Sequence, residues 1–162
     1  MSRRRVLVVL TVVLTLIAAG AWWRASADHR VEDPARAEVM AAAARTTTAL
    51  MTRKADDQPV LPSAAKNLTG RLADEYASQG ADVVLPGAVE EKMAMTARVV
   101  GTGTAEIGIN RARVLVFVDL WARPADADRE IPRVALARWA SMRKVDGTWL
   151  LAGLTPVTGT LS

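Results

Sequence analysis

Cysteine is absent from all 162 residues of the chain, and histidine occurs once, as His29. A chain without thiols forms no disulfide, no thiolate metal site and no cysteine nucleophile. No histidine pair and no run of alternating aspartates around a central glycine is present, so the usual zinc and calcium ligand sets cannot be assembled locally. We therefore expect no metal and no cofactor, and we interpret His29 as a surface residue rather than a catalyst.

Charge is missing from one long stretch, residues 6–23, which reads VLVVLTVVLTLIAAGAWW and follows three arginines. As a helix, such a run is about as long as the ~30 Å hydrocarbon core of a bilayer is thick. Cations on the N-terminal flank favour the cytoplasmic side, and Trp22 and Trp23 suit the opposite interface. The pattern predicts a cytoplasmic tail at 1–5, a transmembrane anchor at 6–23 and an extracytoplasmic remainder, in a single-pass plasma-membrane protein.

A cleavable secretory signal is the alternative interpretation of the same segment. Ala25-Ser26-Ala27 is a small-x-small tripeptide placed after the apolar run, as a peptidase site would be. Two tryptophans and Arg24 separate the run from that site, and the run is longer than the usual core of about 7–15 residues. Both interpretations export the rest of the chain, and they differ in whether it stays tethered.

Clusters of basic residues are also missing from the exported part. The formal net charge is +4, but the three N-terminal arginines supply most of it and leave +1 without them. Since no lysine or arginine cluster interleaved with aromatics follows, the electrostatic footprint of a nucleic-acid-binding protein is absent. About 135 residues remain after the anchor, which is enough for one compact domain.

Two helices are predicted before the strands begin. Asp33 and Pro34 are typical of a helix start, and a juxtamembrane helix within 24–54 would end near Arg53. Its apolar stripe recurs at helical spacings and consists of Val39, Met40, Ala43, Thr47, Leu50 and Met51. This stripe could bind a partner or pack on its own domain. After a proline-containing loop, Ser63 would cap a second helix that continues to about Gly80.

The period changes to that of strands after Pro86 and Gly87. Residues 93–99 alternate apolar and polar, Gly101 and Gly103 predict a bulge or bend, and residues 112–123 form a central strand with both faces largely covered. A third strand at 131–144 leads through Asp146-Gly147, a hairpin signal, into a fourth. The predicted class is α+β, with an exported domain at 55–162 whose helices pack on a curved antiparallel sheet.

Several segments in this order together resemble the actinobacterial Mce-associated membrane proteins. They are the single N-terminal span, the alanine-rich helix, the Leu68-Thr69-Gly70 triplet, the ARVLVF strand at 112–117 and the KVDGTW segment at 144–149. The resemblance implies a cone-like domain of the nuclear transport factor 2 type and an accessory role beside Mce-type lipid or sterol importers. It carries no catalytic motif, so the matched positions are interpreted as structural.

A pocket inside such a domain would have an apolar lining. The candidates are Tyr76, Met93, Met95, Phe117, Trp121 and Trp139, which could hold a lipid or sterol or simply fill a solid core. Asp119 shares a strand face with apolar residues and is the one weak candidate for a general base. We expect a non-catalytic accessory protein whose partners are the membrane and Mce-type transporter subunits. The alternatives are an exported lipid-binding module or a small dehydratase or isomerase.

Overall fold

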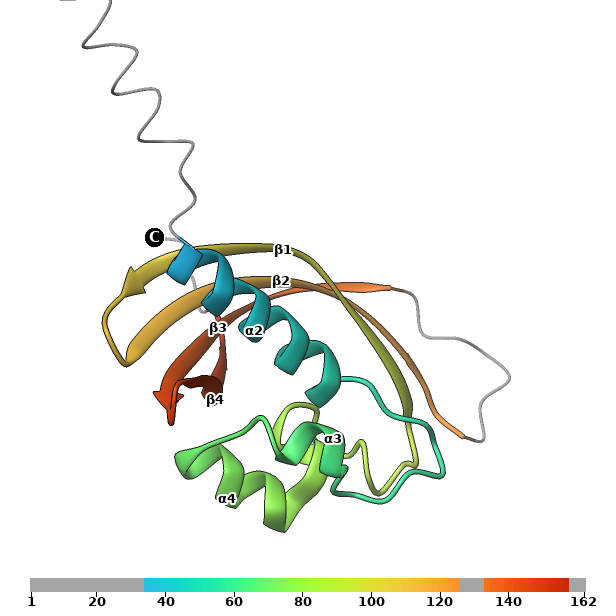
Figure 1. The fold of residues 1–162 in the computed structure, drawn as a ribbon. Helices are drawn as coiled ribbons and strands as arrows, with labels where there is room; N and C mark the ends of the chain where they lie inside the picture. Colours follow the sequence, from blue (N-terminus) through green and yellow to red (C-terminus); the bar gives the residue numbers. More distant parts are fainter. Residues whose placement is uncertain (1–33, 126–132, 158–162) are drawn as a thin grey trace, which may run out of the picture. The chain divides into compact units, whose positions relative to one another are not determined.

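The computed structural model describes residues 34–125 and 133–157. Within these residues, three α-helices, a short 3₁₀-helix and four strands follow one another (Figure 1). They are α2 (Pro34–Leu50), α3 (Pro62–Ala65), α4 (Gly70–Gln79), η1 (Gly80–Val83), β1 (Ala94–Ile107), β2 (Arg111–Arg123), β3 (Val134–Val145) and β4 (Thr148–Pro156). The strands pair in the order β1-β2-β3-β4, each antiparallel to the next, so the predicted α+β class and meander are confirmed.

The predicted anchor at 6–23, the tripeptide Ala25-Ser26-Ala27 and His29 all lie outside the described residues. Within 34–125 and 133–157, no helix is both long enough and apolar enough to cross a membrane.

The core lies between the helices and one face of the sheet, which we call the inner face (Figure 1). Alternate residues of β2 on this face are buried, from Ala112 to Leu120, and Ala140 and Met142 of β3 continue the layer. Two isolated bridges join the helical segment to the sheet edges, Arg53 to Met95 and Leu68 to Leu151. The helices of the described residues therefore cover the inner face.

Helix α2 packs on this core with the predicted stripe. Val39, Ala43 and Thr47 are fully buried, and Leu50 and Met51 are 2% and 1% exposed. Of the two interpretations of the stripe, packing on its own domain is the one the structure supports. The helix also belongs to the same compact unit as the sheet.

The continuous second helix predicted at 63–80 is wrong, because the chain breaks it into α3 and α4. Between them, the Thr69 amide donates to the carbonyl of Leu151 at 2.9 Å, and the Leu151 amide donates to the carbonyl of Asn67 at 2.9 Å. Gly70 then adopts φ +58, a left-handed conformation that glycine enters without a Cβ penalty. Pairing with the edge strand β4 therefore competes successfully with helix propagation at this point.

The prediction that both faces of the central strand are covered is also wrong. Along β2 buried and exposed residues alternate, and Phe117 and Trp121 are 44% and 37% exposed on the outer face of the sheet. The bulge prediction is confirmed, since the β1–β2 register shifts between Val99 and Gly101, and again between Thr104 and Glu106. The hairpin prediction is confirmed as well, because Asp146 and Gly147 both adopt positive φ between β3 and β4.

The buried side chain of Arg53 connects two loops near the start of β1 by hydrogen bonds. Arg53 is 6% exposed, and its guanidinium donates to the backbone carbonyls of Ala88 at 3.4 Å and Asp57 at 3.0 Å. Hydrogen bonds from a charged donor are stronger than neutral ones, and the planar fork of arginine reaches several carbonyls at once.

We therefore expect Arg53→Lys to lower the free energy of unfolding by about 2 kcal/mol, since an ammonium cannot reach the same carbonyls. Thermal unfolding of the purified full-length protein, followed by tryptophan fluorescence, measures the change. Arg71→Lys is the control, because the Arg71 side chain is 88% exposed and pairs with Glu75 one turn away. An unchanged thermal unfolding midpoint for Arg53→Lys would contradict the proposed role of the Arg53 guanidinium.

Candidate binding surface on the outer face of the sheet

The structure does not bring the six predicted pocket residues together in one pocket. Tyr76, Met93 and Met95 lie in the core on the inner side and are 2%, 7% and 2% exposed. Phe117, Trp121 and Trp139 belong to the opposite, outer face, because they alternate with the buried residues of β2 and β3. The first three fill the core, and the last three form part of a surface.

Tyr76 has a structural partner for its hydroxyl. The Leu61 amide donates to the Tyr76 hydroxyl oxygen at 3.0 Å, which connects α4 to the start of α3. A buried tyrosine normally satisfies its polar end in this way. Its ring therefore acts as core packing, with the hydroxyl accepting from a loop amide.

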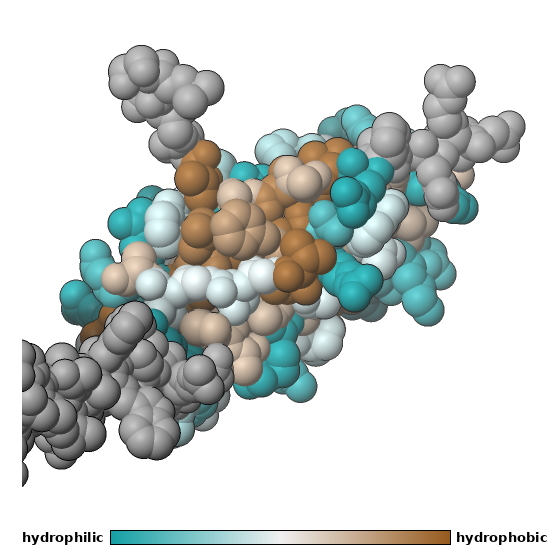
Figure 2. Space-filling view, turned by 90° about the horizontal axis from the view of Figure 1, so that it is seen from above, coloured by the Kyte–Doolittle hydropathy of each residue, from teal (hydrophilic) through white to brown (hydrophobic). Residues whose placement is uncertain are grey.

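We define the outer-face patch as the apolar side chains gathered around Phe117 on this side of the sheet. Its members are Val100, Leu115, Phe117, Trp121 and Trp139. Figure 2, which views the protein from above the sheet as drawn in Figure 1, shows apolar side chains in the middle and hydrophilic ones around them. Val100 is the most exposed member, at 56%.

Small residues on both neighbouring strands leave the ring of Phe117 uncovered. Gly101 of β1 and Ala137 of β3 are its cross-strand partners. A Cβ added at Gly101 would lie 3.5 Å from Cδ2 of Phe117, so the ring lies against the glycine backbone. A depression of about 400 Å³ opens here, lined in part by Phe117, Ala135 and Asp119. The patch therefore offers an aromatic ring beside a shallow hollow.

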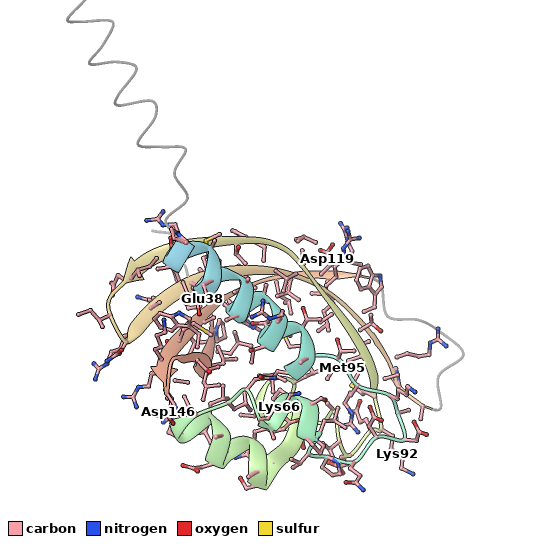
Figure 3. All side chains as sticks on the ribbon, in the orientation of Figure 1. Glu38, Lys66, Lys92, Met95, Asp119 and Asp146 are labelled. Atoms are coloured by element: carbon pink, nitrogen blue, oxygen red, sulfur yellow. The ribbon has the colours of Figure 1, made fainter. Side chains whose placement is uncertain are left out.

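Asp119, the weak candidate for a general base, lies on the same face beside this hollow. Its carboxylate accepts from the guanidinium of Arg133 at 3.2 Å, and its side chain is 13% exposed. It lies toward the end of the sheet opposite Glu38 and Asp146 (Figure 3). Within the described residues, no group of three or more acidic or histidine side chains clusters as metal ligands would. The arrangement is that of an ion pair at the edge of an apolar surface.

Because Arg133 is 60% exposed, solvent weakens this ion pair. We expect Asp119→Asn to lower the free energy of unfolding by less than about 1 kcal/mol. The comparison of thermal midpoints at low and high salt measures the effect, and the small difference should shrink further as salt screens the pair. A loss several times larger would show that Asp119 has a role beyond this contact.

The outer-face patch itself was missed by sequence reasoning. The signal was present, because odd-numbered residues of 111–123 include arginines at both ends and Asp119 in between, which a strand covered on both faces would not tolerate. The dense apolar run at 114–118 obscured that alternation.

No protein-family model matches the chain. The chain is 32% identical over 152 residues to a Mycobacterium tuberculosis protein named "Outer membrane protein Rv1973", and 91% of each sequence is covered. It is 31% identical over 157 residues to "Uncharacterized protein Rv1362c" of the same organism. That match covers 92% of this chain and 70% of the relative.

Among solved structures, the chain is similar to the intermembrane space region of the chloroplast protein ARC6, with a TM-score of 0.50 and 8% identity over 80% of this chain and 99% of that one. An Ntf2-like protein involved in plasmid conjugation matches with a TM-score of 0.46 and 9% identity over 81% of this chain and 42% of that one. Likeness at such low identity concerns the fold alone. The two mycobacterial relatives carry more weight, and the chain belongs to the same family as these Mycobacterium tuberculosis proteins.

Proposed function

We propose that this protein is a non-catalytic accessory module of the cell envelope that binds a protein partner through the outer-face patch. The partner we propose is a subunit of an Mce-type lipid import system. The observation that carries the proposal is the exposure of Phe117 and Trp121 on a face that no helix of the described residues covers.

The composition of the patch supports binding to a protein. Aromatic residues are enriched in the cores of protein interfaces, where a ring that enters a pocket supplies much of the binding energy. Phe117 and Trp139 lie near the middle of the sheet, and Arg98 and Asp119 form polar neighbours at the edge. An apolar centre with a polar rim is the usual organisation of such an interface.

The proposed location rests on two further points. One relative in the family bears the name of an outer membrane protein, and that name supports an envelope location. In this chain, the uncharged run at 6–23 with three arginines before it has the features of a membrane anchor. We propose a single span with the described domain on the extracytoplasmic side.

A lipid carrier is the alternative, and the placement of the predicted lining residues speaks against it. Tyr76, Met93 and Met95 are buried as members of the core cluster on the inner side, on the face opposite Phe117, Trp121 and Trp139. An enzyme would need a second acid or base beside Asp119, whose described partner is Arg133. Accessory binding therefore accounts for more of the structure than either alternative.

The test is gentle detergent extraction of the tagged full-length protein from its native membrane, with mass spectrometry of co-purifying proteins and retained lipids. Recovery of Mce-type importer subunits is the expected result. A stoichiometric lipid without those subunits would favour the carrier, and recovery of neither would overturn the proposed assignment.

A further inference from the structure

Both hairpin tips of the sheet lie at one end, which we call the hairpin end (residues 106–113 and 143–148). The β1–β2 loop and the β3–β4 turn are held together there, because the Lys144 amide donates to the carbonyl of Asn110 at 3.0 Å. Four cations and two carboxylates belong to these two segments. The end therefore has a positive balance that the rest of the exported sequence does not share.

Two arginines at this end face each other across the sheet. Arg111 of β2 is the cross-strand partner of Arg143 of β3, and both are exposed. Like charges placed directly opposite each other destabilise a sheet. Neither arginine forms an ion pair within the described residues. Together with Arg113, Ser141 and the carboxylate of Glu106 they line a depression of about 500 Å³, so three arginines and one acidic residue border it.

Arg113 is held in place beside this depression. Its guanidinium carbon lies 4.3 Å from the centre of the Trp139 ring, a cation–π contact that leaves the N–H groups at its edge free to donate. Planar guanidinium groups pair well with phosphate oxygens. With three arginines against the one carboxylate of Glu106, the charge of the lining favours an anion such as a phosphate group.

Apolar side chains project beside these cations. Ile109 in the β1–β2 loop is 90% exposed, and Ile107 and Val145 are 36% and 40% exposed. A single exposed apolar residue needs no explanation, but three on two adjoining tips form a group. Exposed aliphatic residues beside arginines are the combination that enters the headgroup region of an anionic membrane.

The chain enters the described domain at the same end. Helix α2 begins at Pro34. Near its start, Glu38 forms an ion pair with Lys144, with 3.7 Å between Oε2 and Nζ. Figure 3 shows Glu38 and Asp146 toward this end and Lys92 toward the other. Ten residues separate Trp23 from Pro34, a length that extends to at most about 35 Å. An anchor at 6–23 would therefore keep the hairpin end within reach of the bilayer.

We propose that the hairpin end docks onto the anionic phospholipid surface of the membrane, with Arg111, Arg113 and Arg143 on lipid phosphates and Ile109 in the headgroup region. This inference rests on the anchoring that is part of the proposed function. Docking there leaves Val100, Phe117 and Trp121 of the outer-face patch, which lie farther along the strands, available to a partner. Trp139, which contacts Arg113, lies at the boundary between the two surfaces.

The test uses the absence of cysteine, since Ile109→Cys creates the only thiol in the full-length chain. The protein is labelled there with an environment-sensitive dye and placed in nanodiscs of phosphatidylcholine, with or without about one third phosphatidylglycerol. We expect the anionic lipid to shift the emission to the blue and to protect the dye from iodide. Gln58→Cys, in the exposed loop after α2, is the control and should respond to neither lipid.

Arg111→Gln with Arg143→Gln should remove the response to anionic lipid. Each replacement is expected to lower the ratio of docked to undocked label about fivefold, and high salt should act in the same direction. A thermal midpoint at or above that of the original chain shows that the double variant is folded, since the replacement removes two like charges that face each other. If the dye is equally accessible to iodide in both lipids and the chain stays in the membrane after a carbonate wash, the docking proposal is wrong. The proposed anchoring would then still stand.

Inorganic phosphate and the carbonate wash distinguish a lipid surface from a free anion, and docking from anchoring. Inorganic phosphate added to phosphatidylcholine discs should leave the dye unchanged. Protection by phosphate alone would overturn membrane docking and assign the depression to a free anion. A chain lost from the discs after the carbonate wash would contradict the anchoring itself, and would overturn this inference with it.

Discussion

Gly80→Ala is expected to lower the free energy of unfolding by about 3–5 kcal/mol, which approaches the whole stability of a small domain. Gly80 ends α4 with φ 60 and ψ −136, a conformation that side chains rarely adopt. A Cβ there would overlap the backbone carbonyl of Pro59, and a backbone atom cannot move aside as the end of a side chain can. Thermal unfolding and the yield of folded protein measure the effect.

Gly70→Ala provides the matched control for that substitution. Gly70 also has a positive φ, +58, but a Cβ there would meet nothing within 4 Å. We expect a loss of about 1–2 kcal/mol, which is the cost of the left-handed conformation alone. Equal losses at Gly70 and Gly80 would contradict the close approach between Pro59 and the end of α4.

Phe117→Asp is expected to lower recovery of the protein partner at least about thirtyfold, because truncating or charging a central aromatic residue of an interface costs about 2 kcal/mol or more. Phe117 is 44% exposed, so the change should leave the thermal midpoint within a few degrees of the original. Quantitative mass spectrometry of the co-purified subunits measures the recovery.

Ala77→Asp on the exposed side of α4 is the control for this second prediction, since it adds the same charge on another surface. It should leave partner recovery unchanged. Equal recovery with Phe117→Asp and with the original chain, at equal thermal midpoints, would exclude the outer-face patch as the interface.

The sequence was sufficient to predict the strands because their signals are local. Alternation at 93–99 and the Asp146-Gly147 turn each specify a conformation within a few residues. The structure has β1 at the first of these segments and the β3–β4 hairpin at the second. The buried stripe of α2 was predictable for the same reason, from the spacing of Val39, Ala43 and Leu50.

The break between α3 and α4 depends on a contact with a distant strand, and that contact has no local signal. Leu68 and Leu72 have helical spacing, but Leu68 pairs with Leu151, and this pairing separates α3 from α4. The outer-face patch was missed for a related reason, since the apolar run in β2 matches a strand covered on both faces. Whether a face is covered depends on where the helices pack, and the helices α2, α3 and α4 lie on the inner face.

Site-specific photo-crosslinking in living cells tests the central claim most directly. A photoreactive phenylalanine analogue replaces Phe117 on the outer face, and Gln79 at the exposed end of α4 serves as the control position. We expect a crosslink from position 117 to a protein of the import assembly and none from position 79. No protein crosslink at position 117, or the same crosslinks from both positions, would contradict it.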